Sequence, residues 1–227
     1  MSQLPIIQHC GDSRIDMSQQ KIHRLLKLNL LKPEDSMLHW ELFRPNEDVP
    51  NLSADHRRAL FYPSAGKDFL FPLLVGLPYC TDFFFYEEVR RSDGARKLDI
   101  AVRELLPRSS RREVEVADGH CVEFDFDSVS RRAWIVHQDN LDFLKKDIPL
   151  AFYFHRGDSP GEGGSGQLWD SELLPQLLQK ADRKIGCHIL TDGEPGGLLE
   201  SVAVKCQKVS PPNSHRRRDY FYGVVRD

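Results

Sequence analysis

Three side chains that can move protons or bind metal ions lie close together in a glycine-rich segment of this sequence. They are His155, Asp158 and Glu162, and the segment also contains Gly157, Gly161, Gly163, Gly164 and Gly166. An imidazole and two carboxylates can orient or deprotonate a reacting group, and glycines let a ligand approach the main chain closely. We expect these three residues to be the catalytic part of a site. A flexible connection that faces solvent is the alternative interpretation.

The elements on either side of this segment favour the first interpretation. Residues 150–154 are apolar and aromatic, which is typical of a strand buried on both faces. Residues 168–181 carry apolar side chains at helical spacing. A strand, a polar loop and a helix form a unit in which ligands sit outside the carboxyl end of the strand.

Three other predicted strands also end in polar residues. Residues 59–62 lead into a turn with a proline and a glycine, residues 81–86 into two acids, and residues 133–136 into an acidic loop. The side chains at these ends that could contact a ligand are Tyr62, Ser64, Gly66, Asp68, Glu87, Glu88 and Asp139. If the strands are parallel, all of these residues lie at one edge of the sheet.

The composition excludes several classes of protein. A net charge of −3 and a pI near 6.3 give no general attraction to nucleic acid, so we expect none as a partner. The five cysteines are scattered, which argues against a zinc site or a disulfide framework. No run approaches the about 18 apolar residues of a spanning helix, and no signal peptide is recognisable. We expect a cytoplasmic protein that does not enter a membrane.

The remaining segments indicate one α/β domain with a helical extension. The extension, residues 1–52, holds a predicted helix at 19–31, and we expect it to be packed on the main domain at 53–227. A second helix is predicted at 98–106. Residues 113–116 and 122–126 alternate apolar with acidic side chains around an Asp-Gly turn, which predicts a hairpin. Residues 202–209 and 220–225 predict a final antiparallel pair.

This order of elements resembles the class I S-adenosylmethionine-dependent methyltransferase fold over residues 54–227. The resemblance implies a Rossmann-like, mostly parallel central sheet with an antiparallel C-terminal strand pair, and S-adenosylmethionine as cofactor. It places Tyr62, Ser64, Gly66 and Asp68 at the methionine end of the cofactor, Glu87 or Glu88 at the ribose, and Asp139 at the adenine. It places His155, Asp158 and Glu162 where the methyl acceptor binds.

Two departures from the family pattern leave other functions open. The first loop has Gly66 alone where the family usually has two or three glycines, and the loop after residue 154 lacks the Asn-Pro-Pro-Tyr type of motif. A binding or interaction module on the same scaffold, holding a nucleotide-like ligand or a protein partner without chemistry, is therefore the first alternative. Metal-assisted hydrolysis by His155, Asp158, Glu162 and Asp192 is the second.

Overall fold

The computed structural model describes residues 19–31, 52, 56–63, 65–66, 68–87, 93–117, 119–156, 173–191, 206–209 and 220–227. The helices are α1 (Gln19–Lys27), α2 (Leu70–Gly76), α3 (Gly94–Leu105), the 3-10 helix η4 (Asn140–Lys145) and α4 (Leu173–Gln179). The strands are β1 (Ala59–Tyr62), β2 (Asp82–Tyr86), β3 (Arg111–Val116), β4 (Gly119–Phe126), β5 (Val129–Val136), β6 (Leu150–His155), β7 (Cys187–Thr191), β8 (Cys206–Val209) and β9 (Tyr220–Val225).

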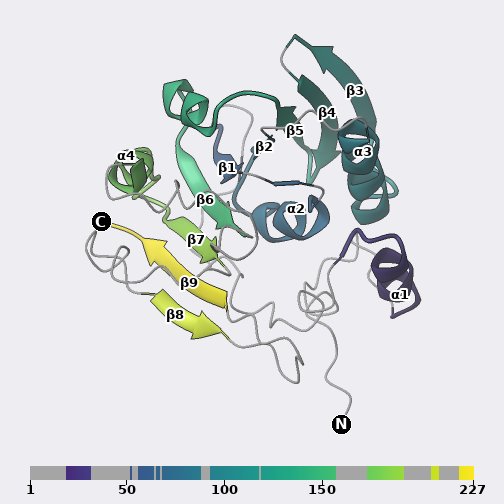
Figure 1. Ribbon diagram of the computed structural model, residues 1–227, viewed down its shortest axis with the longest axis horizontal. Coiled ribbons are helices and arrows are strands. Elements are labelled where there is room, and N and C mark those ends of the chain that lie inside the picture. Colours follow the sequence, from purple (N-terminus) through teal and green to yellow (C-terminus); the bar gives the residue numbers. More distant parts are fainter. Residues whose placement is uncertain are drawn as a thin grey trace.

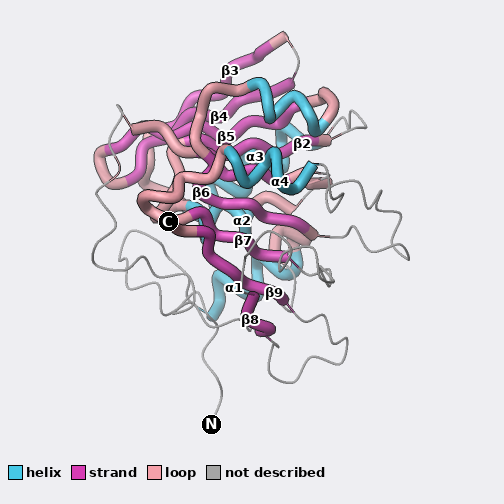
Figure 2. Tube along the Cα trace, turned by 90° about the vertical axis from the view of Figure 1, so that its left-hand side faces the viewer, coloured by secondary structure: helices cyan, strands magenta, loops and turns pink. Residues whose placement is uncertain are grey.

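The nine strands of the described residues form one sheet in the order β3-β4-β5-β2-β1-β6-β7-β9-β8. Figure 2 shows them stacked from β3 at one end to β8 at the other. Strands β5, β2, β1, β6 and β7 are parallel. Counted along the chain, these parallel strands have the order 3-2-1-4-5, which is that of a doubly wound sheet. The order reverses between β1 and β6, and we call this place the switch point.

The C-terminal strands run against the parallel core, as the sequence predicts. Strand β9 pairs antiparallel with β7 on one side and with β8 on the other. In Figure 1 the arrows of β6 and β7 point the same way and the arrow of β9 points the opposite way. The prediction of a mostly parallel α/β sheet with an antiparallel C-terminal pair is therefore confirmed.

The predicted hairpin is present and is larger than its sequence pattern indicates. Strands β3 and β4 pair antiparallel, and β4 also pairs antiparallel with β5, so the three form a meander. The turn between β4 and β5 is Asp127-Ser128, and both residues have positive φ angles of 56° and 60°. Two successive residues with positive φ give a turn whose twist matches that of paired strands. The meander extends the sheet beyond the parallel core.

Helices cover both faces of the sheet. One hydrophobic cluster joins the strands to α1, α2 and α3 through residues such as Leu25, Leu73 and Leu98. A second cluster joins the opposite face to η4 and α4 through Phe143 and Leu177. Figure 1 shows α1, α2 and α3 on one side of the sheet and α4 on the other. None of the helices in the described part of the chain is long and apolar enough to span a membrane.

Several predicted elements have different bounds in the structure. Helix α1 ends at Lys27 rather than at residue 31, and α3 begins at Gly94 rather than at residue 98. The sequence also predicts a strand at residues 184–190, and β7 begins only at Cys187. The later start of β7 follows from a turn at 183–185 and from Gly186, whose φ of 107° is unfavourable for other residues. Of the helix predicted at 168–181, only α4 lies within the described residues.

Candidate functional site

The carboxyl ends of the parallel strands meet at one edge of the sheet. Strand β1 ends at Tyr62, β2 leads to Glu87, β5 leads to Asp139 and β6 ends at His155. Strand β9 is antiparallel, so its first residue, Tyr220, lies at this same edge. In open α/β sheets this edge, at the switch point, is where ligands bind. We call it the ligand edge.

The loop after β1 is tied to the end of the neighbouring strand β2. The Ala65 N–H donates to the Tyr86 carbonyl at 2.9 Å, and the Asp68 N–H donates to the Ala65 carbonyl at 3.2 Å. Gly66 has a φ of +60°, which a residue with a side chain adopts only with strain. The loop therefore makes a tight turn toward α2. Ser64 lies outside the described residues.

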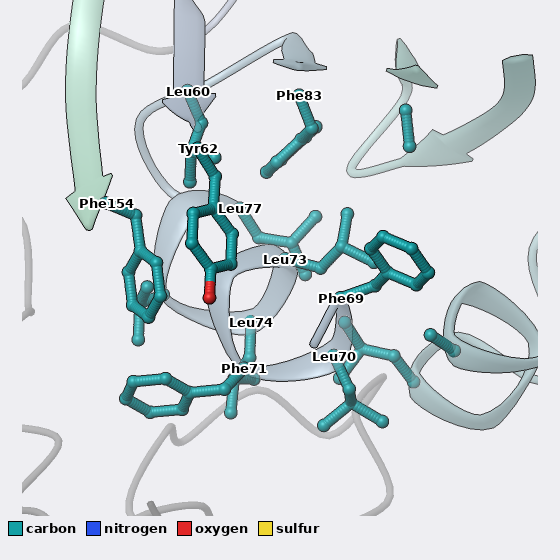
Figure 3. Close-up of a cluster of buried hydrophobic side chains, with 14 of the residues drawn as sticks. Leu60, Tyr62, Phe69, Leu70, Phe71, Leu73, Leu74, Leu77, Phe83 and Phe154 are labelled. Carbon is teal, nitrogen blue, oxygen red and sulfur yellow. The ribbon is translucent and has the colours of Figure 1, made fainter. Parts of the chain in front are cut away.

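Tyr62 is the last residue of β1 and lies directly before this loop. Its side chain is buried, and its ring packs edge-on against Phe154 with 4.7 Å between the ring centres. Figure 3 shows Tyr62 beside Phe154 and above Phe71 and Leu74 of α2. The tyrosine belongs to the hydrophobic core beside the switch point.

An ion pair spans the switch point. Arg156, directly after β6, places Nη1 2.5 Å from Oδ2 of Asp68, which lies in the loop after β1. The other terminal nitrogen of Arg156, Nη2, donates to the hydroxyl of Tyr220 at the start of β9. The side chains of Arg156 and Asp68 are only 2% and 10% exposed. Three segments that are far apart in the sequence are thus joined by one guanidinium.

Glu87 lies at the end of β2 and is buried. Its N–H donates to the Val136 carbonyl at 3.0 Å, which continues the pairing of β2 with β5. Its carboxylate faces the start of α3, because a Cβ placed on Gly94 would lie 3.4 Å from Glu87 Oε2. The first turn of a helix favours a negative charge. Glu88 lies outside the described residues.

Asp139 follows β5 and is exposed. Its Oδ1 accepts a hydrogen bond of 2.9 Å from the Leu141 N–H, so Asp139 is the N-cap of η4. This contact explains why a short helix begins at Asn140. It also leaves the second carboxylate oxygen available to a ligand at the ligand edge.

His155 ends β6 and is buried between neighbouring strands. Its Nδ1 lies 3.1 Å from Oγ1 of Thr191, the last residue of β7. A hydrogen bond to one ring nitrogen fixes the orientation of an imidazole and the role of the other nitrogen. Asp158, Glu162 and Asp192 lie outside the described residues. Within the described residues, no three His, Cys, Asp or Glu side chains are grouped closely enough to hold a metal ion.

Two residues of this edge receive no role from the sequence. In the sequence Tyr220 is predicted only as the start of a strand, and Thr191 only as the first residue after one. Arg156 is visible as a charged residue beside His155, but its partner Asp68 is 88 positions away. The signal in the sequence is the polar residues that directly follow the predicted strands. This signal identifies the ligand edge, but it does not show which side chains pair there.

Comparison with known proteins gives matches among solved structures alone. No family model matches the chain, and no curated protein matches it. MnmC2 from Aquifex aeolicus is 12% identical with a TM-score of 0.43, and the match covers 74% of this chain and 53% of that one. An antibiotic-related methyltransferase is 11% identical with a TM-score of 0.42, covering 79% and 97%.

A third similar structure is a precorrin-6y C5,15-methyltransferase from Geobacter metallireducens. It is 10% identical with a TM-score of 0.39, and the match covers 82% of this chain and 95% of that one. This chain therefore spans about half the length of the first protein and nearly all of the other two. The Rossmann-like fold of this chain is established by its own strand order and pairing.

Proposed function

We propose that this protein binds S-adenosylmethionine at the ligand edge and transfers its methyl group to an acceptor. The observation that supports the proposal is the strand order. It puts a tight glycine turn, a buried acid and a capping acid after the first, second and third parallel strands, all at one edge. A nucleoside bound across these strands could meet Gly66, Glu87 and Asp139 in turn.

Each strand end has a proposed part in holding the cofactor. The loop with Tyr62, Ser64, Gly66 and Asp68 would take the methionine end. Glu87 or Glu88 would accept hydrogen bonds from the ribose hydroxyls, because a carboxylate can accept from two neighbouring hydroxyls at once. Asp139, whose Oδ1 is occupied by the cap of η4, would offer Oδ2 to the adenine.

The residues after β6 would act on the acceptor. Bound S-adenosylmethionine supplies an electrophilic methyl group, so the protein mainly needs to hold the acceptor in line with it. Asp158 or Glu162 would orient the acceptor or remove its proton. His155 would do so through Nε2, since Nδ1 lies at hydrogen-bond distance from Thr191.

A binding module without chemistry is the second candidate, and one observation favours it. Asp68 and Arg156 pair directly across the switch point, where a ligand would have to enter. A scaffold that keeps this pair closed could serve as an interaction surface. Titration with S-adenosyl compounds distinguishes a protein that binds them from an interaction surface that does not. If the protein binds them, an assay of methyl transfer distinguishes the enzyme from a binding module without chemistry.

Isothermal titration calorimetry with S-adenosylmethionine and S-adenosylhomocysteine tests the cofactor proposal. The Glu87→Gln variant keeps the size of the side chain and removes its charge. Hydrogen bonds to a charged group contribute about 1.5–3 kcal/mol, so this variant should bind roughly 10- to 150-fold more weakly. Asp139→Asn should have a smaller effect because Asp139 is exposed.

Glu123→Gln on β4 is the matched control and should bind as the wild type does, because Glu123 pairs with Arg112 within the meander. Glu88→Gln must be measured beside Glu87→Gln, since successive residues of an extended chain point to opposite sides. The absence of heat with either ligand at millimolar concentration would contradict the cofactor proposal.

A further inference from the structure

The helices on the two faces of the sheet differ in charge. On one face, α1 and α3 contain no acid other than Asp99 and Glu104. On the opposite face, α4 has no charged residue, and the single lysine and single aspartate of η4 pair with each other. The cations of α1, of α3 and of the chain that leads from α3 into β3 form what we call the basic face, which consists of Lys21, Arg24, Lys27, Arg96, Lys97, Arg103, Arg108 and Arg111.

The two acids of these helices are buried, and each binds two of the cations. Glu104 pairs with Lys21 and, at 2.7 Å, with Arg24, so it joins α3 to α1. Asp99 pairs with Arg103 at 2.6 Å and with the first residue of β3 at 3.4 Å. Figure 1 shows α1 next to α3 on this side of the sheet. Cations from three elements are therefore held in one surface, and the acids between them are buried.

Much of the positive charge on the basic face is not neutralised. Lys27, Arg96, Lys97 and Arg108 make no ion pair with any other described residue. Arg24 has a partner, and its side chain is still 64% exposed. Like charges gathered on one surface repel one another, and a polyanion that lies across them removes this repulsion. Its own condensed counterions are released at the same time, which favours binding.

The composition of the basic face favours nucleic acid among the possible polyanions. Five of its eight cations are arginines, whose planar fork matches a phosphate group. An acidic membrane is a poorer match, because the apolar residues Ile22 and Leu25 of α1 are buried in the core and cannot enter a lipid surface. The expectation of no nucleic-acid partner used the net charge of the whole chain, and that average conceals a surface where cations are concentrated.

We propose that the basic face binds the phosphate backbone of a nucleic-acid duplex. Neither α1 nor α3 contains a phenylalanine, tyrosine or tryptophan on which an unpaired base could stack, so the contacts are made to phosphates. Contacts to phosphates carry no sequence information, and the binding is therefore independent of sequence. This inference goes beyond the proposed function and does not depend on methyl transfer.

Fluorescence anisotropy with a labelled DNA duplex of mixed sequence tests the proposal. The logarithm of the association constant should fall linearly with the logarithm of the salt concentration, with a slope of about −0.9 for each phosphate contacted. The variant that combines Lys27→Gln, Arg96→Gln and Arg108→Gln should reduce the size of this slope by about 3. An exposed contact between opposite charges contributes about 2- to 5-fold in affinity, so this variant should bind roughly 10- to 100-fold more weakly.

A second triple variant, which combines Arg112→Gln, Arg183→Gln and Lys184→Gln, is the matched control. It removes the same amount of charge from exposed positions outside the basic face. Arg112 follows Arg111 on β3 and so points to the opposite side of the sheet. The other two residues lie in the turn before β7. This control should bind the duplex as the wild type does. Both variants should keep the wild-type melting temperature, because the pairs made by Asp99 and Glu104 are unchanged in each.

Three results would overturn the proposal. One is the failure of the wild type to bind the duplex at low salt, and another is an equal loss of affinity in the two triple variants. The third is binding of the wild type to phosphatidylserine vesicles but not to the duplex, which would assign the basic face to a membrane surface. Titration with S-adenosylhomocysteine tests the cofactor site separately, so either proposal can fail without the other.

Discussion

Buried polar residues lie at both edges of the sheet, and they are paired differently at each. At the edge opposite the ligand edge, Asp82 is fully buried and is bound by Arg57 and Arg132 from neighbouring segments. At the ligand edge, Asp68 and Arg156 pair across the switch point. The first arrangement joins the starts of strands, and the second joins the ends where a ligand is expected. The same residue types therefore join strand starts at one edge and, at the other edge, lie where we propose that the cofactor binds.

His188 on β7 is a buried residue whose protonation state affects stability. Its Nδ1 lies 2.6 Å from the Tyr222 hydroxyl, and its ring lies 4.0 Å from that of Tyr79, measured between ring centres. Burial, with a contribution from the nearby charge of Arg226, lowers the pKa of His188 to about 3. The folded protein therefore holds this imidazole neutral at pH values where the unfolded chain takes up a proton.

This difference predicts a pH dependence of stability. Between about pH 6.5 and pH 3 the unfolded state binds a proton at His188 that the folded state does not, so the free energy of unfolding falls as the pH falls. The contribution is up to about 1.4 kcal/mol per pH unit. Urea unfolding at pH 7, 6 and 5 should show a smaller decrease for His188→Phe than for the wild type. His23→Gln, at an exposed position, should keep the wild-type decrease, and identical decreases in all three proteins would contradict the prediction.

At the scale of elements, α2 packs closely against the sheet at Gly76. A Cβ atom on Gly76, the last residue of α2, would lie 2.7 Å from Leu60 Cδ1 and 2.8 Å from Phe83 Cε1. Such distances require the neighbours to shift, so the glycine sets how closely the helix approaches β1 and β2. That approach in turn positions the loop between β1 and α2, which carries Gly66 and Asp68.

Gly76→Ala should therefore destabilise the fold. Overpacking of a core costs about 1–3 kcal/mol, which outweighs the gain of up to about 1 kcal/mol that alanine gives over glycine in a helix. Chemical denaturation measures the difference. Gly94→Ala in α3 is the matched control, because the nearest atoms would lie at 3.4 and 3.5 Å, which are ordinary contacts. A Gly76→Ala variant as stable as the wild type would show that α2 can move away from the sheet at little cost.

The parallel strands could be predicted because each contains a run of apolar residues, as in β6, where every residue is buried. The end of each apolar run also predicts where the strand ends. The turn at Asp127-Ser128 was not predicted, because neither residue is a glycine although both have positive φ. The pairing of Asp68 with Arg156 could not be predicted either, since it joins residues 88 positions apart and depends on which strands are neighbours. Local patterns thus identify the ligand edge, and the strand order is needed to show which of its side chains meet.

At the scale of the whole molecule, we propose different roles for the two edges of the sheet, ligand binding at one and stabilisation at the other. The ligand edge carries the strand ends near Gly66, Glu87, Asp139 and Arg156. The opposite edge carries the starts of the same strands, including Asp82 and its arginine partners. A ligand that binds at the first edge should slow the local opening of that edge and leave the opposite edge unchanged.

Hydrogen–deuterium exchange measured by mass spectrometry, with and without S-adenosylhomocysteine, tests this placement most directly. We predict slower exchange in peptides that cover residues 62–69, 86–88, 136–141 and 154–156, which are the carboxyl ends of β1, β2, β5 and β6. Peptides that cover residues 56–59, 79–82 and 148–150 should exchange as they do in the free protein. Protection confined to those last peptides, or no protection anywhere at saturating ligand, would contradict a cofactor site at the ligand edge.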